Sequence, residues 1–385
     1  MISVRSDGSR HTSFNSIASV IAVALDLRDP RRSGLARVAT SIARAFLARF
    51  SDEFAITLAG PVKTLEEMGL RGSGGAARIV AWDAGRYSPG NLQWLRAKEQ
   101  AGPAIWYFPH WDVPWLGTPD RFVVTMHDMA HLLLPDQNTL KRFVARHWIQ
   151  RSLSRARRVM VGSEFTAREV ASAWPSLANK LAVVPHGVDA PFFADASPLP
   201  RDISSRLFGD PYMLSVGIRK ERKNLRMGVE VLSRVPTLRW VVVGDWYPEW
   251  ESVEALAAAA GVSDRMIVLD RQDEETLRAL YGAAAFLLFP SRYEGFGLPI
   301  LESLASGTPV VASGTTSTGE VLGGAGWLCD PDDAPAFARA AQEILALGPP
   351  RRAEVAERGR ARAGGFTWER SAEGLAEAFR AAARP

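Results

Sequence analysis

"AFLLFPSRYEGFGLPILESLASGTPVVASG", residues 285–314, contains the alternation that decides the fold. Its first and last apolar runs, at 285–291 and 309–314, are continuous, which is typical of strands buried on both faces of a parallel sheet. The stretch between them has helical spacing and places Pro299 in the first turn, where a missing N–H is harmless. The sequence therefore predicts a strand, a loop, a helix and a second, parallel strand.

The same alternation extends along most of the chain. In the second half, further apolar runs occur at 212–217, 239–245, 265–270 and 326–331. In the first half, less regular runs occur at 19–27, 54–60, 105–109, 121–128, 158–163 and 180–187. Helical patterns separate these runs, so we expect an α/β protein of two Rossmann-like, doubly wound domains that face a cleft.

The expected domain boundaries follow from breaks in this pattern. Proline and small residues interrupt it at 188–202, so the first domain is expected to span 1–195, with 1–17 as a tail, and the second 196–365. Residues 366–385 form a final helical pattern with no strand after it, which could cap either domain. A chain of 385 residues is longer than one core usually supports, which agrees with two domains.

Composition narrows the class of protein. Hydrophobic residues make up 47% and charged residues 23% of the chain, which excludes a disordered chain and an integral membrane protein. The single cysteine, Cys329, excludes an intramolecular disulfide and a cysteine-rich metal site. A single cysteine fits a protein of the reducing cytoplasm. Because Cys329 ends a hydrophobic run, we expect its thiol to be buried on a strand.

The net charge of +4 is unevenly distributed, because residues 1–200 hold 24 Lys and Arg against 17 Asp and Glu. The densest basic stretch lies between Lys141 and Arg158, where basic and apolar residues alternate near helical spacing and no acid occurs. This pattern suits a helix on an anionic membrane, at its cytoplasmic face. It better suits the solvated face of a helix packed on its own domain. No motif for nucleic acid accompanies the charge.

The ends of the predicted strands are the places to look for a site, because ligands of parallel sheets bind there. Glu294 follows the strand at 285–291, and the amides of 295–297 precede a helix, where they suit an anion or a sugar hydroxyl. Glu302 falls about one turn into that helix, and its carboxylate could accept hydrogen bonds from both hydroxyls of a ribose. The alternative is a loop acid and a solvated helix acid.

Two further loops could carry chemistry. "SVGIRKERKNLRMGV" (215–229) has a strand ending at Gly217, and its Arg222 and Lys223 stand before a helix, which predicts a phosphate site or, alternatively, a solvated basic turn. "RFVVTMHDMAHLLLP" (121–135) places His127 and Asp128 directly after a strand, where Asp128 could orient the histidine. A lone histidine is also often structural.

Weaker signals come from the first half of the chain. Gly34 precedes a helix in the loop after the first strand. The aromatic stretch "IWYFPHWDVPW" (105–115) could offer Trp111 or Trp115 to an acceptor sugar, although buried packing is the alternative for most of these rings.

Taken in this order, these stretches resemble the retaining glycosyltransferases of family 4 with the GT-B fold, especially bacterial polysaccharide mannosyltransferases. "EGFGLPILE" resembles the family's Glu-x7-Glu signature, "SVGIRKERKN" its basic loop, "VGSEFTAREV" its SEFSA segment and "FTWERSAEGL" its closing helix. Four positions depart from the family pattern. "GLAR" replaces GIGR, "TGEV" replaces Pro-Glu-Val, Glu221 stands where the basic loop has proline, and "VLDRQ" lacks a glycine.

The resemblance implies a role for each matching position. Arg222 and Lys223 would hold the donor diphosphate, Glu302 the ribose hydroxyls, and Gly34 would let the first loop approach the phosphate. Glu294 and the amides of Phe296, Gly297 and Leu298, beside Gly295, would hold the donor sugar and phosphate. His127 would touch the sugar near its reacting carbon, which makes His127, Glu294, Arg222 and Lys223 the expected catalytic residues, with Asp128 on the acceptor side. The closing helix would cross back to the first domain.

The implied reaction is transfer of mannose from GDP-mannose to a glycan or lipid-linked saccharide, with retention. Two cations and helix-end amides stabilise a departing diphosphate, so no metal or other cofactor is expected. The alternatives are a nucleotide-sugar epimerase of the same fold and a non-catalytic nucleotide-sugar-binding subunit.

Overall fold

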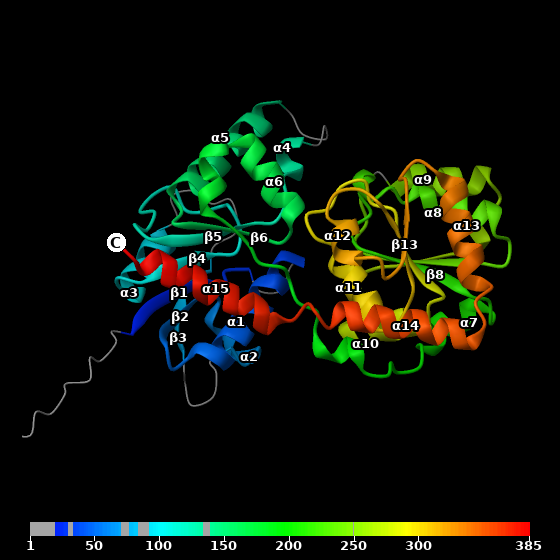
Figure 1. The fold of residues 1–385 in the computed structure, drawn as a ribbon, viewed down its shortest axis with the longest axis horizontal. Helices are drawn as coiled ribbons and strands as arrows, with labels where there is room; N and C mark the ends of the chain where they lie inside the picture. The colour runs from blue at the N-terminus through cyan, green and yellow to red at the C-terminus, as the bar shows by residue number, and fades with distance from the viewer. Residues whose placement is uncertain (1–19, 30–33, 71–76, 84–91, 134–138, 249) are drawn as a thin grey trace, which may run out of the picture.

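The computed structural model of the chain describes residues 20–29, 34–70, 77–83, 92–133, 139–248 and 250–385. It contains two parallel sheets, each covered by helices (Figure 1). The predicted α/β class with two Rossmann-like domains is confirmed. The expected tail, 1–17, lies outside the described residues.

The first sheet has seven strands in the order β3-β2-β1-β4-β5-β6-β7. These are β1 (Ile21–Asp26), β2 (Phe54–Gly60), β3 (Ala77–Ala81), β4 (Ile105–Phe108), β5 (Phe122–Met126), β6 (Arg158–Val161) and β7 (Leu181–Val183). The helices of this half are α1 (Gly34–Phe50), α2 (Val62–Glu67), α3 (Leu92–Ala101), α4 (Ala130–Leu133), α5 (Thr139–Arg155) and α6 (Glu164–Ala173).

The second sheet has six strands in the order β10-β9-β8-β11-β12-β13. These are β8 (Tyr212–Val216), β9 (Arg239–Val243), β10 (Met266–Leu269), β11 (Phe286–Phe289), β12 (Val310–Ser313) and β13 (Trp327–Cys329). Its helices are α7 (Arg201–Leu207), α8 (Arg226–Arg234), α9 (Trp250–Ala259), α10 (Glu274–Ala283), α11 (Leu298–Ala305), α12 (Thr318–Leu322), α13 (Ala334–Leu345) and α14 (Pro349–Ala363). Cys329 is buried, as expected.

Both sheets reverse their winding direction at one point. In the first sheet β1 pairs with both β2 and β4, and in the second β8 pairs with both β9 and β11. The loops that leave the two strands at such a reversal diverge to opposite faces and open a crevice at the carboxyl ends. The predicted loops at 215–229 and 291–298 both lie at the reversal of the second sheet.

The predicted strands match the observed ones, with one omission. All six runs of the second half are strands, as are the six of the first half. The sequence analysis missed β3, which has only β2 as a neighbour and leaves Arg78 exposed. An edge strand need not be apolar along its whole length, so it lacks the continuous run that identifies the others.

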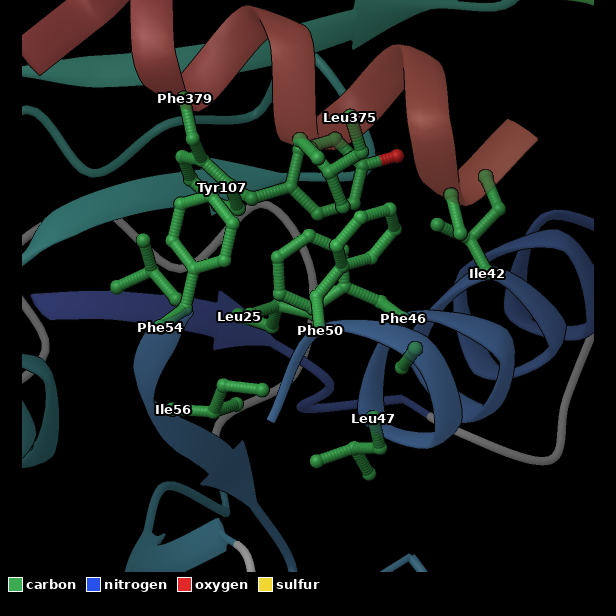
Figure 2. Packing of buried hydrophobic residues seen from close by; sticks show 14 of the residues in the cluster. Leu25, Ile42, Phe46, Leu47, Phe50, Phe54, Ile56, Tyr107, Leu375 and Phe379 are labelled. Atoms are coloured by element: carbon green, nitrogen blue, oxygen red, sulfur yellow. The ribbon is translucent and has the colours of Figure 1, made fainter. Parts of the chain in front are cut away.

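The final helix, α15 (Trp368–Ala383), packs on the first domain although it follows α14 of the second (Figure 1). Phe379 of α15 contacts Phe46 and Phe54, with ring centroids 5.6 and 6.0 Å apart. Figure 2 shows these rings beside Leu375 in the core between α15, α1 and the sheet. Burial of these large side chains provides the free energy that holds the chain's end on the first domain.

The chain already contacts the second domain before the predicted boundary at residue 196. Val188 and Phe192 already pack in the core of the second domain, and the ring of Phe192 lies 5.8 Å from that of Tyr281. The first residues of the interrupted stretch at 188–202 therefore pack on the second domain, with Phe192 buried there and the neighbouring Phe193 exposed. No described helix is long and apolar enough to cross a membrane.

Candidate active site

A cleft of about 760 Å³ separates the two sheets at the carboxyl ends of their strands. The first domain contributes the start of α1 and the loop after β5, and the second contributes the loops after β8, β9, β10 and β11. Twelve of the predicted site residues line this cleft: Gly34, His127, Asp128, Gly217, Arg222, Lys223, Glu294, Gly295, Phe296, Gly297, Leu298 and Glu302.

Glu294 lies between the two predicted cations. Lys223 Nζ contacts its Oε1 at 2.5 Å, and an Nη of Arg222 contacts its Oε2 at 3.4 Å. Burial favours a raised pKa for Glu294, but the charges of Lys223 and Arg222 outweigh this effect and hold its pKa below the usual value. Burial also lowers the pKa of Lys223, and Glu294 offsets part of that shift. The carboxylate is therefore ionised and cannot readily take a proton.

Glu302 has different partners. It is almost fully buried in α11, and Tyr281 Oη donates to its Oε2 at 2.7 Å. Its Oε1 forms an ion pair with Arg37 of α1, in the first domain. The two glutamates of the 285–314 stretch are therefore held by separate groups and do not form one acid–base couple.

The N-terminus of α11 points into the same cleft. Gly297 caps the helix with φ +112°, a conformation that residues with a Cβ rarely adopt. Ser317 Oγ donates to the carbonyls of Glu294 and Phe296 at 2.9 and 3.0 Å, which fixes the loop before the helix. The first amides of a helix lack intrahelical partners and carry a partial positive charge, so this end can bind an anion.

His127 reaches the cleft from the end of β5. Its Nε2 lies 2.6 Å from the carbonyl oxygen of Pro109, which only accepts, so Nε2 carries the hydrogen. This contact orients the imidazole, a task for which the sequence suggested Asp128. Asp128 Oδ1 accepts a hydrogen bond from the Ala130 amide at 3.0 Å and so caps the short α4.

Two other predicted glycines, Gly217 and Gly34, have different surroundings. Gly217 has φ +132°, and a Cβ on Gly244 would come within 1.8 Å of its carbonyl oxygen, so the loops after β8 and β9 pack backbone against backbone. Gly34 begins α1, and a Cβ there would meet no atom within 4 Å. Open space beside Gly34 is compatible with close approach of a ligand, while no contact within the protein demands glycine.

The predicted acceptor tryptophans do not line the cleft. Trp111 is buried, with its ring centroid 5.8 Å from that of Trp148. Trp115 is exposed, but Arg151 covers its ring at 5.2 Å and it lies away from the cleft residues. Trp111 is therefore a buried packing residue, which was the alternative expectation. The geometry does not support stacking of an acceptor sugar on either ring.

The two halves of the chain match two family models. Residues 32–191 match Glycosyltransferase Family 4, and residues 201–362 match Glycosyl transferases group 1. An O-antigen chain mannosyltransferase B of Escherichia coli is 30% identical over 259 residues, which is 65% of this chain and 68% of that protein. The chain belongs to the GT-B glycosyltransferases.

Other relatives of this glycosyltransferase carry different names. A D-inositol 3-phosphate glycosyltransferase of Mycolicibacterium smegmatis is 27% identical over 348 residues, covering 84% of this chain and 75% of that protein. Among solved structures, the sucrose-phosphate synthase of Thermosynechococcus elongatus has a TM-score of 0.71 at 22% identity, covering 93% of this chain and 98% of that one. Anabaena Alr3699/HepE in complex with UDP-glucose has a TM-score of 0.71 at 18% identity, covering 92% and 98%. At these identities the structures show a common fold.

The cleft of the glycosyltransferase contains residues that were not among the predicted site residues, although Lys220 lies in the predicted basic loop. Lys220 and Tyr247 lie together, with the ammonium 4.7 Å from the ring centroid, and Arg271 and Gln272 follow β10. His186 after β7 lies between His127 and Phe296, at ring separations of 5.3 and 4.8 Å. The strand-end rule that found His127 would have found all of them, because each follows a predicted strand.

Within the described residues, no three His, Cys, Asp or Glu side chains are grouped closely enough to bind a metal ion. Asp330 and Asp332, the only Asp-x-Asp pair near a strand end, serve other contacts. The Asp332 amide donates to Asp330 Oδ1 at 2.9 Å, and the Asp332 side chain pairs with Arg292. Asp333, the next residue, caps α13.

Proposed function

We propose that this protein transfers mannose from GDP-mannose to a glycan or lipid-linked saccharide, with retention of the anomeric configuration. The observation that supports a nucleotide diphosphate donor is the convergence of Lys223, Arg222 and the N-terminus of α11 on one part of the cleft. Cations and helix-end amides are the groups that bind a diphosphate. The name of the Escherichia coli relative supports mannose as the sugar.

In the proposed reaction, the bond between the anomeric carbon and the diphosphate oxygen breaks, and its electron pair stays on the diphosphate. Lys223, Arg222 and the amides of 296–298 stabilise that charge, so the scheme requires no metal ion. The acceptor hydroxyl forms the new bond on the same face of the sugar, and its proton passes to the departing diphosphate. Glu294, which its two cations keep ionised, accepts hydrogen bonds from the donor sugar and does not act as the base.

The first domain completes the site. His127 reaches the cleft from β5 and lies beside the position proposed for the donor sugar. The acceptor approaches from this side, between His127 and the start of α1. Closure of the domains over the donor excludes water, which would otherwise compete with the acceptor for the anomeric carbon.

A thermal-shift screen tests the donor. GDP-mannose is expected to raise the melting temperature more than UDP-glucose or dTDP-glucose, and stabilisation by UDP-sugars without any by GDP-mannose would contradict the proposed donor. In Lys223→Met the affinity for GDP should fall by about tenfold or more, because one charged hydrogen bond to phosphate is lost. Lys63→Met is the matched control, since Lys63 lies on α2 with 91% of its side chain exposed.

Product analysis tests the reaction type. With GDP-mannose and an acceptor glycan, nuclear magnetic resonance should show a new linkage with the anomeric configuration of the donor. An inverted product would exclude retention. An epimerised nucleotide sugar would favour the epimerase, and donor binding without any turnover would favour the non-catalytic subunit.

We also propose that α4 and α5 contact an anionic membrane at its cytoplasmic face. Leu133, Phe143 and Val144 expose about half of their side chains there. Val144 and Arg155 lie eleven residues apart, which is about three helical turns, so they share a face of α5. Exposed basic side chains attract anionic lipid headgroups, and exposed apolar side chains beside them can be buried at the membrane surface. Arg151 and Arg158 of the basic stretch are instead engaged with the carbonyls of Trp115 and Asn179.

Flotation with liposomes of phosphatidylglycerol and phosphatidylethanolamine tests this contact. The wild type should float, whereas Val144→Ser combined with Arg155→Glu should stay in the soluble fraction. Arg44→Glu, on α1, is the control for the change in net charge, because Arg44 is an exposed residue of another helix. Equal flotation of the double variant and the wild type would contradict the proposal.

A further inference from the structure

Arg37 links three parts of the molecule. It lies in α1 of the first domain, three residues after Gly34, and its side chain is about one-third exposed to the cleft. Its guanidinium forms an ion pair with Glu302 of the second domain and, through Nε at 2.9 Å, a hydrogen bond with Asp189. The carboxylates of Glu302 and Asp189 raise its pKa, although burial opposes them.

Arg37 and Tyr281 each hold one oxygen of Glu302 and leave the carboxylate partly available. Arg37 donates to Oε1, and Tyr281 Oη donates to Oε2 at 2.7 Å. A carboxylate can accept about four hydrogen bonds, two at each oxygen. One acceptor position therefore remains on each oxygen, and the two hydroxyls of a ribose provide two donors. The two contacts also fix the plane of the carboxylate, which would otherwise rotate.

Asp189 connects this carboxylate system to the chain segments that join the domains. Its Oδ1 accepts a hydrogen bond from Trp368 Nε1 at 2.6 Å, at the start of α15. The segments before α15 and after β7 lie side by side, because the Val188 amide donates to the Phe366 carbonyl at 3.1 Å. A Cβ on Gly187 would come within 2.3 Å of the Trp368 amide nitrogen, so the two crossings are tightly packed.

We propose that Arg37 is a positioning residue for the nucleotide ribose. It is supplied by the first domain, orients Glu302 in the second and, through Asp189, ties that orientation to the hinge. Ribose recognition then depends on the arrangement of the two domains, although Glu302 itself belongs to the second. This inference rests on the proposed function, because it requires that Glu302 binds a nucleotide ribose.

A purely structural ion pair would behave differently. Loss of a structural pair lowers stability and affects all ligands of the cleft alike. Loss of a group that orients Glu302 weakens mainly the binding of ligands that form hydrogen bonds with its carboxylate. A nucleotide that lacks one ribose hydroxyl therefore separates the two possibilities.

The experiment compares ribose and 2′-deoxyribose nucleotides. The affinities of the full chain for GDP and dGDP, and for UDP and dUDP, are measured by calorimetry in the wild type, Arg37→Met, Arg37→Lys and Arg44→Met. The wild type should prefer the ribonucleotide by roughly tenfold, as expected for one hydrogen bond to a charged group. In Arg37→Met this preference should fall close to one, while the affinity for the deoxynucleotide changes little.

The other two variants are controls. Arg44 is exposed on the same helix and donates to the Met68 carbonyl, away from Glu302, so Arg44→Met should keep the wild-type preference. Arg37→Lys keeps the charge but lacks the planar fork that spans two carboxylates, so it should keep only part of the preference. If Arg37→Met does not fold, Arg37→Lys and its melting temperature provide the same comparison.

Two results would overturn the proposal, and they differ from each other. An undiminished preference in Arg37→Met or Arg37→Lys would show that Arg37 does not act on ribose binding, and it would leave the proposed function intact. Equal affinity of the wild type for ribo- and deoxynucleotides would show that Glu302 does not bind the ribose. In that case the assignment of Glu302 under the proposed function fails first, and the role of Arg37 fails with it.

Discussion

His186 is buried among rings from both parts of the molecule, with Phe296 at 4.8 Å and Trp368 at 6.4 Å between centroids. Burial lowers its pKa from 6.5 to about 4, so the folded protein keeps this side chain neutral. Below pH 6.5 the unfolded chain takes up a proton that the folded chain excludes. His186 therefore leaves the free energy of unfolding unchanged above pH 6.5. As the pH falls from 6.5 to 4, that free energy decreases by about 3 kcal/mol in total.

The variant His186→Asn should therefore resist acid better than the wild type does, whatever its stability at pH 7. Melting temperatures measured between pH 7 and 4 should fall less steeply in the variant, because asparagine does not titrate. His147→Asn serves as the control, since His147 is exposed on α5. Parallel pH profiles for His186→Asn and the wild type would show that His186 does not titrate in this range.

At the scale of single residues, the sequence located the loop side chains but not their partners. Glu294, Lys223 and His127 could be assigned to a cleft because each follows a strand that its apolar run identifies. The ion pair of Glu302 with Arg37 joins residues 265 positions apart, and no local pattern indicates such a pair. The sequence likewise did not predict that Pro109 orients His127, because a backbone carbonyl has no residue signature.

Among the secondary-structure elements, the helix α11 is important for donor binding, because amides at its start are proposed to bind the donor. Gly297, with φ +112°, turns the chain so that the helix begins directly after the Glu294 loop. Alanine at this position would be strained by about 1–2 kcal/mol, and the strain would be relieved by rotating the first amides. Gly297→Ala should therefore lose affinity for GDP by several-fold in addition to a small loss of stability.

The control for this variant is Gly348→Ala. Gly348 also precedes a helix, α14, but it has φ −68° and a Cβ added there would meet no atom within 4 Å, so alanine fits. Calorimetry with GDP distinguishes the two variants. Equal GDP affinities for both would mean that the α11 amides do not contact the diphosphate.

Among the secondary-structure elements, the sequence predicted those whose identifying pattern lies within one short stretch of residues. The strand β11 and the helix α11 carry a continuous apolar run, a turn and Pro299, all within 30 residues of sequence. The edge strand β3 has no such signal, and the packing of α15 on α1 depends on side chains such as Phe46 and Phe379 that meet only in the folded chain. The amphipathic pattern of α15 predicts a helix without indicating which domain it covers, and only the family resemblance implied the first domain.

At the scale of the whole molecule, contacts in addition to the Arg37 ion pair hold the two domains together. The Oγ of Ser163, the N-cap of α6, donates to the Gly295 carbonyl at 2.8 Å. Glu320, in the "TGEV" segment that departs from the family pattern, accepts hydrogen bonds from the Glu164 and Phe165 amides at 2.9 and 3.2 Å. A carboxylate of one domain thus caps a helix of the other, which the helix dipole favours. Sequence alone could not show which loops meet across the cleft.

Tyr293 is the contact that best tests whether these interactions set the domain arrangement. It lies beside Glu294 in the chain. Its Oη donates to Glu169 Oε2 at 2.5 Å and accepts a hydrogen bond from the Met129 amide at 2.9 Å. Both partners belong to the first domain. Tyr293→Phe removes both hydrogen bonds while keeping the ring, so the open arrangement should become more populated, with an unfavourable change of about 1–3 kcal/mol for the closed one.

Small-angle scattering should then give a larger radius of gyration for Tyr293→Phe than for the wild type, and saturating GDP-mannose should reduce the difference. The affinity for GDP should change less than the rate of transfer, because the groups proposed to bind the diphosphate lie in the second domain, whereas His127, proposed to contact the sugar, belongs to the first. Tyr212→Phe is the control, since Tyr212 donates to the Leu280 carbonyl within the second domain. If Tyr293→Phe and the wild type scatter alike and transfer sugar at the same rate, these contacts do not control closure.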